Sequence, residues 1–390
     1  MEKKDCIVYL GLSGFPYGMA AIQRQLIISK AISQNGLKVC IVCSRSTHSG
    51  EITVNKRGTF EGIDYFYLFD PFRGKSFIKR NIQRILIPVM EFLLLKEIGK
   101  VNKIKAAIIS NRNLILNNIW YCFLSKLFGF KIVVNLVEDY SKREGRSAGR
   151  RVNDFFFDRI GLWFSNGYLP ISHFLIEKNI GLRRKYFYLP VLVDPKPFIN
   201  SIQKPENCLY FLYCGSASYF SSIEIILDAF SLVDRDEYKL MLITDGSEDE
   251  LQRVYRLMEK LDISDRIQVK SKISYELLVS YYCGAVGLLL PMFQTVQDEA
   301  RFPHKLGEYL ASKRPVITNL VGELKYYLED GRNVIVFNTN DSKSLAEKMV
   351  WLIENEEMGK RIGLEGFRVM EKHFNVDIVG EKLVDFLTNL

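Results

Sequence analysis

The sequence predicts an α/β protein made of two doubly wound, Rossmann-like domains, and three observations support this fold class. The chain of 390 residues suits two domains of ordinary size, and 48% of its residues are apolar, enough for two sizeable cores. A strand, a glycine-rich loop, a helix and a second strand open the chain at 6–44, and the same winding restarts at 209. We expect one domain at 1–190 and another at 191–375.

Charge is distributed unevenly between the two halves. Residues 1–190 hold 30 Lys and Arg against 14 Asp and Glu, a net charge of +16, whereas residues 191–390 carry a net charge of −8. This asymmetry predicts that the first half meets an anionic partner. We expect no nucleic acid among the partners.

Cysteine usage and hydropathy indicate the compartment. The seven cysteines are spaced irregularly, and Cys40 and Cys43 form a C-x-x-C inside an apolar strand with no second pair to complete a zinc site. Core thiols in a reducing cytoplasm explain this pattern best. Met1 leads straight into a strand without a signal-peptide pattern, and no apolar run is long enough to span a bilayer.

The region 73–105 combines positive charge with apolar residues. It holds nine Lys and Arg against two Glu, interleaved with Ile85, Leu86, Val89 and Phe92. A basic amphipathic helix of this kind can lie on an anionic membrane surface. A packing helix of the Rossmann layer with a solvated basic end accounts for the pattern equally well, so both interpretations stay open.

Two acidic residues follow a buried strand in the first half. After paired strands within 51–70, buried strands are predicted at 106–110 and 131–136, and Glu138 and Asp139 come directly after the last of these. Open α/β sheets place ligands at such carboxyl ends. Five basic residues come next, in a loop that either holds acceptor phosphates or is simply solvated: Lys142, Arg143, Arg146, Arg150 and Arg151.

The second half alternates strands and helices throughout. Apolar runs predict strands, and residues at helical spacing predict helices between them. The expected strands are 209–214, 238–244, 266–270, 285–290 and 333–337, and the expected helices are 222–233, 248–261, 274–283, 342–354, 357–372 and 376–390.

The stretch 299–323 carries the strongest site signal. Pro303 suits the first turn of a helix, and Leu306, Tyr309 and Leu310 recur at the spacing of its core face. Arg301 and Lys305 accompany the free N–H groups at the helix start, which predicts a phosphate site. Glu308, one turn further, could accept hydrogen bonds from a pair of sugar or ribose hydroxyls.

This stretch resembles a known signature. Arg-Phe-Pro-His-Lys-Leu-Gly-Glu-Tyr-Leu-Ala at 301–311, then Arg-Pro-Val-Ile and Val-Gly-Glu, is similar to the donor site of family 4 retaining glycosyltransferases of the GT-B fold. The loop Gly14-Phe-Pro-Tyr17-Gly18 resembles the N-terminal, acceptor-side loop of the same family. The resemblance covers nearly the whole chain, and it implies that 376–390 crosses back onto the first domain.

The resemblance also implies roles for individual residues. Glu308 would hold the ribose, while Arg301 and Lys305 would face the diphosphate or the sugar, and Glu138 joins them as a catalytic candidate. The remaining donor candidates are Gly215 and Ser216 for the phosphates, Asp245 and Gly246 for the nucleoside, and Lys272 and Ile273 beside the base. No metal or other cofactor is implied.

Two positions depart from the family pattern. Ala300 stands where the first glutamate of E-x7-E is expected, so the sugar contact falls to Glu299, Asp298 or Gln297. The loop after 209–214 lacks the usual basic pair and reads Ser-Ala-Ser-Tyr-Phe-Ser, so phosphate binding would depend on Arg301 and Lys305.

The combined prediction is a glycosyltransferase that moves a sugar from a nucleotide-diphosphate donor to a glycan or lipid-linked acceptor in cell-surface polysaccharide synthesis. We expect it in the cytoplasm, peripheral at the inner membrane face. A catalytically inactive homologue that binds nucleotide as a scaffold is the alternative that Ala300 favours. A sugar-nucleotide epimerase of similar fold fits the basic first half less well.

Overall fold

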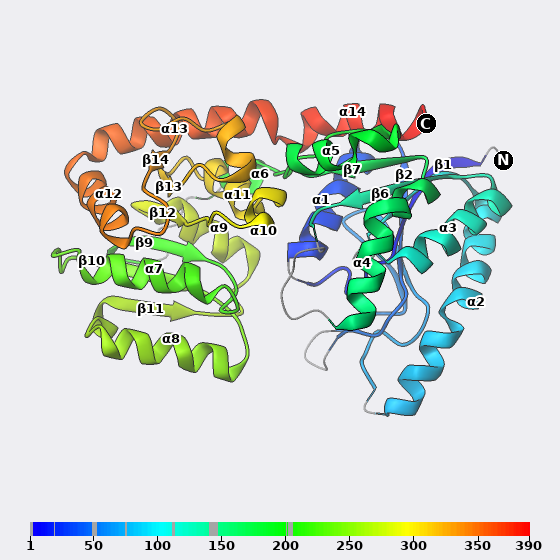
Figure 1. The fold of residues 1–390 in the computed structure, drawn as a ribbon, viewed down its shortest axis with the longest axis horizontal. Helices are drawn as coiled ribbons and strands as arrows, with labels where there is room; N and C mark the ends of the chain where they lie inside the picture. The colour runs from blue at the N-terminus through cyan, green and yellow to red at the C-terminus, as the bar shows by residue number, and fades with distance from the viewer. Residues whose placement is uncertain are drawn as a thin grey trace. The chain divides into compact units, whose positions relative to one another are not determined.

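The computed structural model divides the chain into two compact units, which are described separately. Unit 1 comprises Met1–Leu192 and Val376–Leu390, and unit 2 comprises Val193–Asn375 (Figure 1). The structure describes residues 3–18, 20–48, 53–74, 76–110, 114–139, 147–199, 201 and 206–390.

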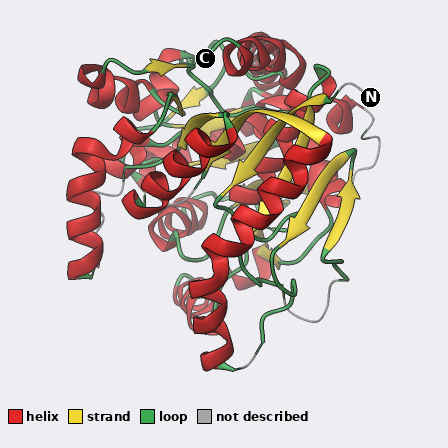
Figure 2. Cartoon of the chain, turned by 90° about the vertical axis from the view of Figure 1, so that its right-hand side faces the viewer, coloured by secondary structure: helices red, strands yellow, loops and turns green. Residues whose placement is uncertain are grey.

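Unit 1 is built on an eight-stranded sheet in the order β3-β4-β2-β1-β5-β6-β7-β8, in which only β3 runs antiparallel to its neighbour. Figure 2 shows twisted strands with helices packed around them. Its elements, with η for 3-10 helices, are β1 (Lys4–Leu10), α1 (Ala20–Gln34), β2 (Lys38–Cys43), β3 (Arg57–Phe60), β4 (Ile63–Tyr67), α2 (Phe77–Val101), β5 (Asn102–Ile109), α3 (Ile115–Phe128), β6 (Lys131–Leu136), α4 (Ala148–Ile160), η1 (Gly161–Phe164), β7 (Gly167–Pro170), α5 (His173–Asn179), η2 (Ile180–Leu182), β8 (Lys185–Tyr186) and α14 (Val376–Thr388).

Unit 2 is built on a parallel six-stranded sheet in the order β11-β10-β9-β12-β13-β14. Its elements are α6 (Lys196–Ile199), β9 (Leu209–Cys214), α7 (Phe220–Ser231), β10 (Tyr238–Ile243), α8 (Glu248–Lys260), η3 (Ser264–Arg266), β11 (Ile267–Lys270), α9 (Tyr275–Gly284), β12 (Gly287–Leu290), α10 (Val296–Ala300), α11 (His304–Ala311), β13 (Val316–Thr318), η4 (Gly322–Tyr326), β14 (Ile335–Val336), α12 (Ser342–Glu354) and α13 (Glu356–His373).

The central strands are apolar on both faces because helices cover both sides of each sheet. In β1, Ile7 and Tyr9 pack with α1 and α14, whereas Cys6 and Val8 pack with α2 and α3. This alternation follows from the two-residue period of a strand. The prediction that the C-x-x-C thiols belong to the core agrees with Cys40 and Cys43, which are buried in β2.

The last helix, α14, packs on unit 1. Val376, Val379, Leu383 and Leu387 recur at helical spacing and join the core formed by α1 and the sheet. The packing of 376–390 onto the first half, which the family resemblance implied, is therefore present in the structure.

Several element boundaries differ from the sequence prediction. Pro303 is the N-cap of α11, with φ −67° and ψ 121°, so the helix begins one residue later than expected. A short helix that was not predicted, α10, precedes it, and Thr295 caps that helix by accepting a hydrogen bond from the Asp298 N–H. Helices α3 and α4 were not predicted, and β5 begins at Asn102 rather than at 106.

Candidate functional site

Helix α11 divides its residues between a core face and a polar face, as the sequence predicted. Leu306, Tyr309 and Leu310 are buried in the interior of unit 2. Lys305 and Glu308, three residues apart, share the polar side, and their Nζ and Oε2 atoms lie 3.2 Å apart. The two charges therefore stabilise each other before any ligand binds.

Tyr282 of α9 completes this pair. Lys305 Nζ donates to the Tyr282 hydroxyl at 2.8 Å, and that hydroxyl donates to Glu308 Oε2 at 3.3 Å. Burial alone would lower the pKa of the Lys305 ammonium, but the nearby Glu308 carboxylate and Cys214 thiol outweigh burial and raise that pKa. Lys305 is thus a cation at neutral pH. Both contacts use Oε2, and no described residue donates a hydrogen bond to Oε1.

A second tyrosine fixes α11 to the end of β9. The Cys214 N–H donates to the Tyr309 hydroxyl at 2.9 Å, and the rings of Tyr309 and Tyr282 meet edge to face with centroids 5.2 Å apart. Sequence reasoning placed Tyr309 in the core but missed its hydroxyl contact, and it missed Tyr282 altogether. Nothing in the periodicity of 274–283 marks Tyr282, because its role depends on a partner in another helix.

Arg301 pairs with an acidic residue close to Ala300, the position that departs from the family pattern. Its Nη2 atom lies 2.6 Å from Asp298 Oδ1, and its guanidinium carbon lies 4.9 Å from the ring centroid of Tyr219. The Arg301 Nε atom is buried without a hydrogen-bond partner among the described residues. An orphaned buried donor of this kind requires an acceptor that the described protein groups do not supply.

The acidic residues around Ala300 have different tasks. Asp298 is buried, and its Oδ2 atom accepts the Phe293 N–H at 2.7 Å, so both of its oxygens have partners within the fold. Glu299 is more exposed and lies 3.7 Å from the Lys325 ammonium. Of these two, Glu299 is the more accessible to a ligand.

The loop after β9 differs from its predicted use in one respect. The Gly215 N–H donates to Ile243 O at 3.1 Å, so it is occupied by the backbone rather than presented to a phosphate. A Cβ at Gly215 would come within 2.3 Å of the Tyr213 hydroxyl, which gives this glycine a packing role. Among the described residues, no acceptor is bonded to the Ser216 N–H, which is the backbone donor that this loop can offer.

The loops after β9 and β10 pack against each other. The Ala217 N–H and the Ser216 hydroxyl both donate to Asp245 O, at 3.0 and 3.3 Å. A Cβ at Gly246 would lie 2.8 Å from the Cβ of Ala217, so only glycine permits this approach. The structure thereby brings together four predicted donor residues at the carboxyl ends of adjacent strands.

Lys272 and Ile273 lie at the carboxyl end of β11, beside β10. Lys272 adopts a φ of 52°, in the left-handed region, as the chain turns toward α9. Three adjacent strands therefore present the residues predicted for nucleoside and phosphates at one edge of the unit 2 sheet, which is where such sheets bind ligands.

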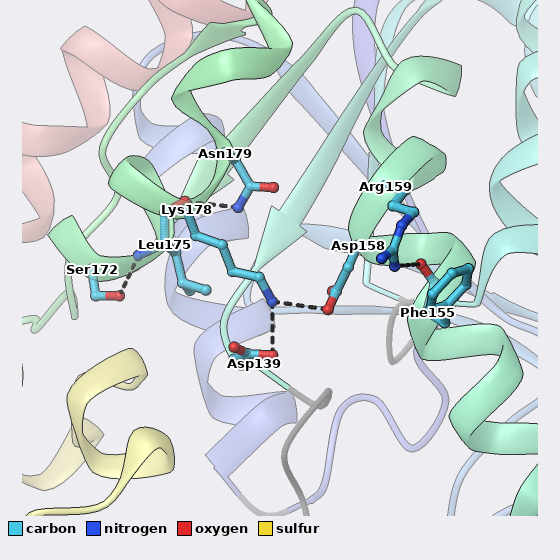
Figure 3. Close-up of polar contacts among 8 residues, drawn as sticks. All are labelled: Asp139, Phe155, Asp158, Arg159, Ser172, Leu175, Lys178 and Asn179. Atoms are coloured by element: carbon cyan, nitrogen blue, oxygen red, sulfur yellow. Dashed lines mark hydrogen bonds and ion pairs between the residues drawn. The ribbon is translucent and has the colours of Figure 1, made fainter.

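In unit 1, Glu138 and Asp139 follow β6 as predicted, but the second of them is the more deeply buried. Lys178 of α5 reaches between two carboxylates, with its Nζ 3.0 Å from Asp139 Oδ1 and 3.0 Å from Asp158 Oδ2 (Figure 3). Burial raises the pKa of Asp158, and the Lys178 ammonium opposes that rise. Sequence reasoning singled out Asp139 but missed Lys178 and Asp158, because the three residues come from separate elements.

The N-terminal loop lies at the carboxyl end of β1, two strands from β6. Gly14 has a φ of 122°, which favours glycine, and Tyr17 is exposed, with its ring edge-on to Phe60. The Gly18 carbonyl accepts a hydrogen bond from Gln23. Of the predicted basic loop after Asp139, Lys142, Arg143 and Arg146 lie outside the described residues.

Both units are Rossmann-like, and they carry candidate residues at the carboxyl ends of parallel strands. This architecture defines a protein of the GT-B fold. Residues 196–368 match the family model described as "Glycosyl transferases group 1". The matched span contains Arg301, Lys305 and Glu308, and it supports a glycosyltransferase.

Individual relatives agree with this class. An uncharacterised glycosyltransferase of Methanocaldococcus jannaschii is 26% identical over 176 residues, which is 44% of this chain and 45% of the relative. The solved sucrose-phosphate synthase from Thermosynechococcus elongatus is 14% identical, with a TM-score of 0.76 over 99% of each chain. HepE from Anabaena in complex with UDP-glucose is 10% identical, with a TM-score of 0.71 over 99% of this chain and 100% of HepE. At these identities the two structures establish the fold.

Proposed function

We propose that the protein is a retaining glycosyltransferase that takes a hexose from a nucleotide-diphosphate sugar. The observation that carries this proposal is the network of Lys305, Tyr282 and Glu308 at the carboxyl edge of the unit 2 sheet, with Arg301 beside it. The Lys305 ammonium lies near the Cys214 side chain and the Arg301 guanidinium lies near Tyr213, so both cations border the end of β9.

The proposed roles follow from the chemistry of a departing diphosphate. Negative charge grows on that group as the glycosidic bond breaks, and fixed cations stabilise it without a bound metal. Arg301 would offer its unpartnered Nε–H, and Lys305 its ammonium, already oriented by Tyr282. Glu308 would accept ribose hydroxyls at Oε1, while Ser216 would donate its N–H to a phosphate.

The donor that we propose to test first is UDP-glucose, since HepE, which shares this fold, is bound to it. The acceptor would be a glycan or lipid-linked sugar, with the Gly14–Gly18 loop and Glu138 on its side. Asp139, fixed by Lys178, lies beside Glu138 at the same strand end, where it would help to shape the acceptor site.

We also propose peripheral attachment to an anionic membrane. Helix α2 packs Leu94, Leu95 and Ile98 inward but leaves an outer apolar face exposed, formed by Phe77, Ile78, Ile82, Ile85, Leu86, Val89 and Leu93. Phe92, one of the apolar residues interleaved with the basic ones, packs on Phe128 with ring centroids 5.5 Å apart. No helix within the described ranges combines the length and hydropathy of a membrane span.

A coupled assay tests the proposal against the scaffold alternative. The assay would measure nucleotide release from UDP-glucose with membrane glycolipid acceptors, in buffer with and without EDTA. A thermal-shift panel of nucleotides would report binding, since a ligand stabilises the folded state by mass action. We expect acceptor-dependent release that survives EDTA. Binding without release across all donors and acceptors would favour the inactive scaffold, and loss of activity restored by magnesium would contradict the metal-free mechanism.

A further inference from the structure

Unit 1 contains a hollow at the edge of its sheet opposite to the loops that carry Gly14 and Glu138. It has a volume of about 990 Å³ and is lined by the amino ends of β1, β5 and β6 and by the last turns of α2, α3 and α14. Because these strands are parallel, the loops that carry Gly14 and Glu138 lie at the other ends of β1 and β6. The hollow is therefore separate from the site proposed above.

Lysines dominate its lining. Six of them come from four elements or their flanks, and Asp5 is the one acidic side chain among the lining residues; the lysines are Lys3, Lys96, Lys100, Lys103, Lys105 and Lys131. Lys105 lies 3.4 Å from Asp5, and Lys3 donates to Gly99 O at 2.6 Å. No carboxylate of the described residues lies within ion-pair distance of the other four.

The fold supplies part of the missing negative charge, but not all of it. Helices α2, α3 and α14 end at this edge, and each helix C-terminus carries roughly half a negative charge. Together with Asp5 they offset about two and a half of the six positive charges. A surplus of positive charge therefore remains in one concave surface, where the ammonium groups repel one another, and a multivalent anion would relieve this repulsion.

We propose that this hollow binds a multivalent phosphate. Ammonium groups bind phosphate as point charges, and the volume is in the range of small-molecule sites. Phe128 is the single aromatic residue of the lining, and it already packs on Phe92, so the hollow has no free ring to stack a nucleobase. The phosphate belongs either to a soluble compound or to a phospholipid headgroup; exposed Val101 and Leu127 adjoin the lining and suit the second source.

The test compares the full chain with a variant that carries Lys100→Gln, Lys103→Gln and Lys131→Gln. Titration calorimetry with inorganic pyrophosphate at low salt addresses a soluble source. Co-sedimentation with phosphatidylcholine vesicles, with and without phosphatidate, addresses a headgroup. A matched control with Lys260→Gln, Lys343→Gln and Lys348→Gln in unit 2 makes the same change in net charge. Repeating the pyrophosphate titrations with Arg301→Ala added to each chain removes the contribution of the donor site.

We expect the triple variant to lose roughly tenfold or more in affinity for pyrophosphate, for phosphatidate vesicles, or for both. The control triple should bind as the unmodified chain does, the loss in the lysine variant should persist when Arg301→Ala is present in every chain, and added salt should weaken every positive result. If the lysine variant loses affinity for pyrophosphate alone, the ligand is a soluble compound. If it loses affinity for phosphatidate vesicles alone, the ligand is a phospholipid headgroup. Binding of neither probe by the unmodified chain, or equal binding by the lysine variant with its melting temperature intact, overturns the proposal.

Discussion

The Lys178 ammonium lies 3.0 Å from the Asp139 carboxylate, which is almost completely buried at the end of β6 (Figure 3). Since Lys178 also reaches Asp158, one cation fixes two acidic groups from separate elements. Removing one partner of a buried ion pair leaves a charge without compensation, which costs more than the pair contributes.

Lys178→Met should therefore lower the free energy of unfolding by about 2–3 kcal/mol, less than for a fully buried pair because Lys178 is partly exposed. Urea denaturation would measure this loss. Lys178→Arg should retain most of the stability, and adding Asp139→Asn to Lys178→Met should recover part of it. A Lys178→Met variant as stable as the unmodified chain would show that the two carboxylates do not need this cation.

Glu308→Gln should weaken donor binding while the fold stays intact. The carboxylate is expected to accept charge-assisted bonds from ribose hydroxyls, and losing such a bond costs roughly 1.5–3 kcal/mol, or about ten- to a hundredfold in affinity. Calorimetry with UDP would measure the change. Glu357→Gln, which breaks another i,i+3 pair with a lysine, on the exposed side of α13, is the matched control and should bind UDP normally. Unchanged affinity in Glu308→Gln would remove this residue from the site.

Arg301→Ala and Lys305→Ala should each lower turnover more than they lower donor affinity, because the cations are expected to stabilise charge that develops in the transition state. Loss of one such group typically costs about 3 kcal/mol, or on the order of a hundredfold in rate. Steady-state kinetics would separate kcat from KM. Arg368→Ala, which breaks an exposed pair with Glu365, controls for the loss of one positive charge. If both site variants turn over normally, the phosphates bind elsewhere.

Glu91, buried between α2 and α3, should make stability depend on pH. Burial raises its pKa to about 7, although the Tyr121 hydroxyl and the Trp120 indole donate to it at 3.0 and 3.1 Å. The folded chain then binds more protons than the unfolded chain between pH about 4.5 and 7, so the free energy of unfolding falls as pH rises through that window. The loss amounts to about 3 kcal/mol and is complete above the folded pKa.

Urea titrations across this pH window would test Glu91. Glu91→Gln cannot ionise, so its stability should vary much less with pH, while the exposed Glu371→Gln should keep the original slope. An unmodified chain whose stability is flat from acid to neutral pH would show that Glu91 is ionised without penalty.

The outer face of α2 should bind anionic vesicles. Each basic residue near such a surface gains on the order of 1 kcal/mol, which salt screens, whereas inserted apolar side chains are insensitive to salt. Charge reversal at Lys79, Arg80 and Arg84 should therefore reduce co-sedimentation at low salt, and Ile85→Ser with Val89→Ser should reduce what persists at high salt. Reversal of Arg253, Arg256 and Lys260 in unit 2 controls for net charge. Equal binding to neutral vesicles, or none to either, would leave α2 a packing helix alone.

Much of the architecture was readable from the sequence because strands and helices are local patterns. Runs such as Lys131–Leu136 and Leu209–Cys214 were predicted to the residue, since buried parallel strands are nearly continuous apolar runs. Helices α3 and α4 were not predicted because some of their apolar residues lie on exposed faces. Their sequences therefore lack the single apolar stripe that marks an amphipathic helix.

The sequence alone also determined the chemistry of the donor stretch, because Arg301, Lys305 and Glu308 are neighbours along one helix and its approach. Tertiary structure decided which groups hold them: Tyr282 for Lys305 and Glu308, Asp298 for Arg301, and Lys178 for the acid beside Glu138. Tertiary structure also decided that the Gly215 N–H donates its hydrogen bond to Ile243 O. These contacts join strand ends and helices that are distant in the chain, and a hydrogen bond depends on distances and angles that only packing sets.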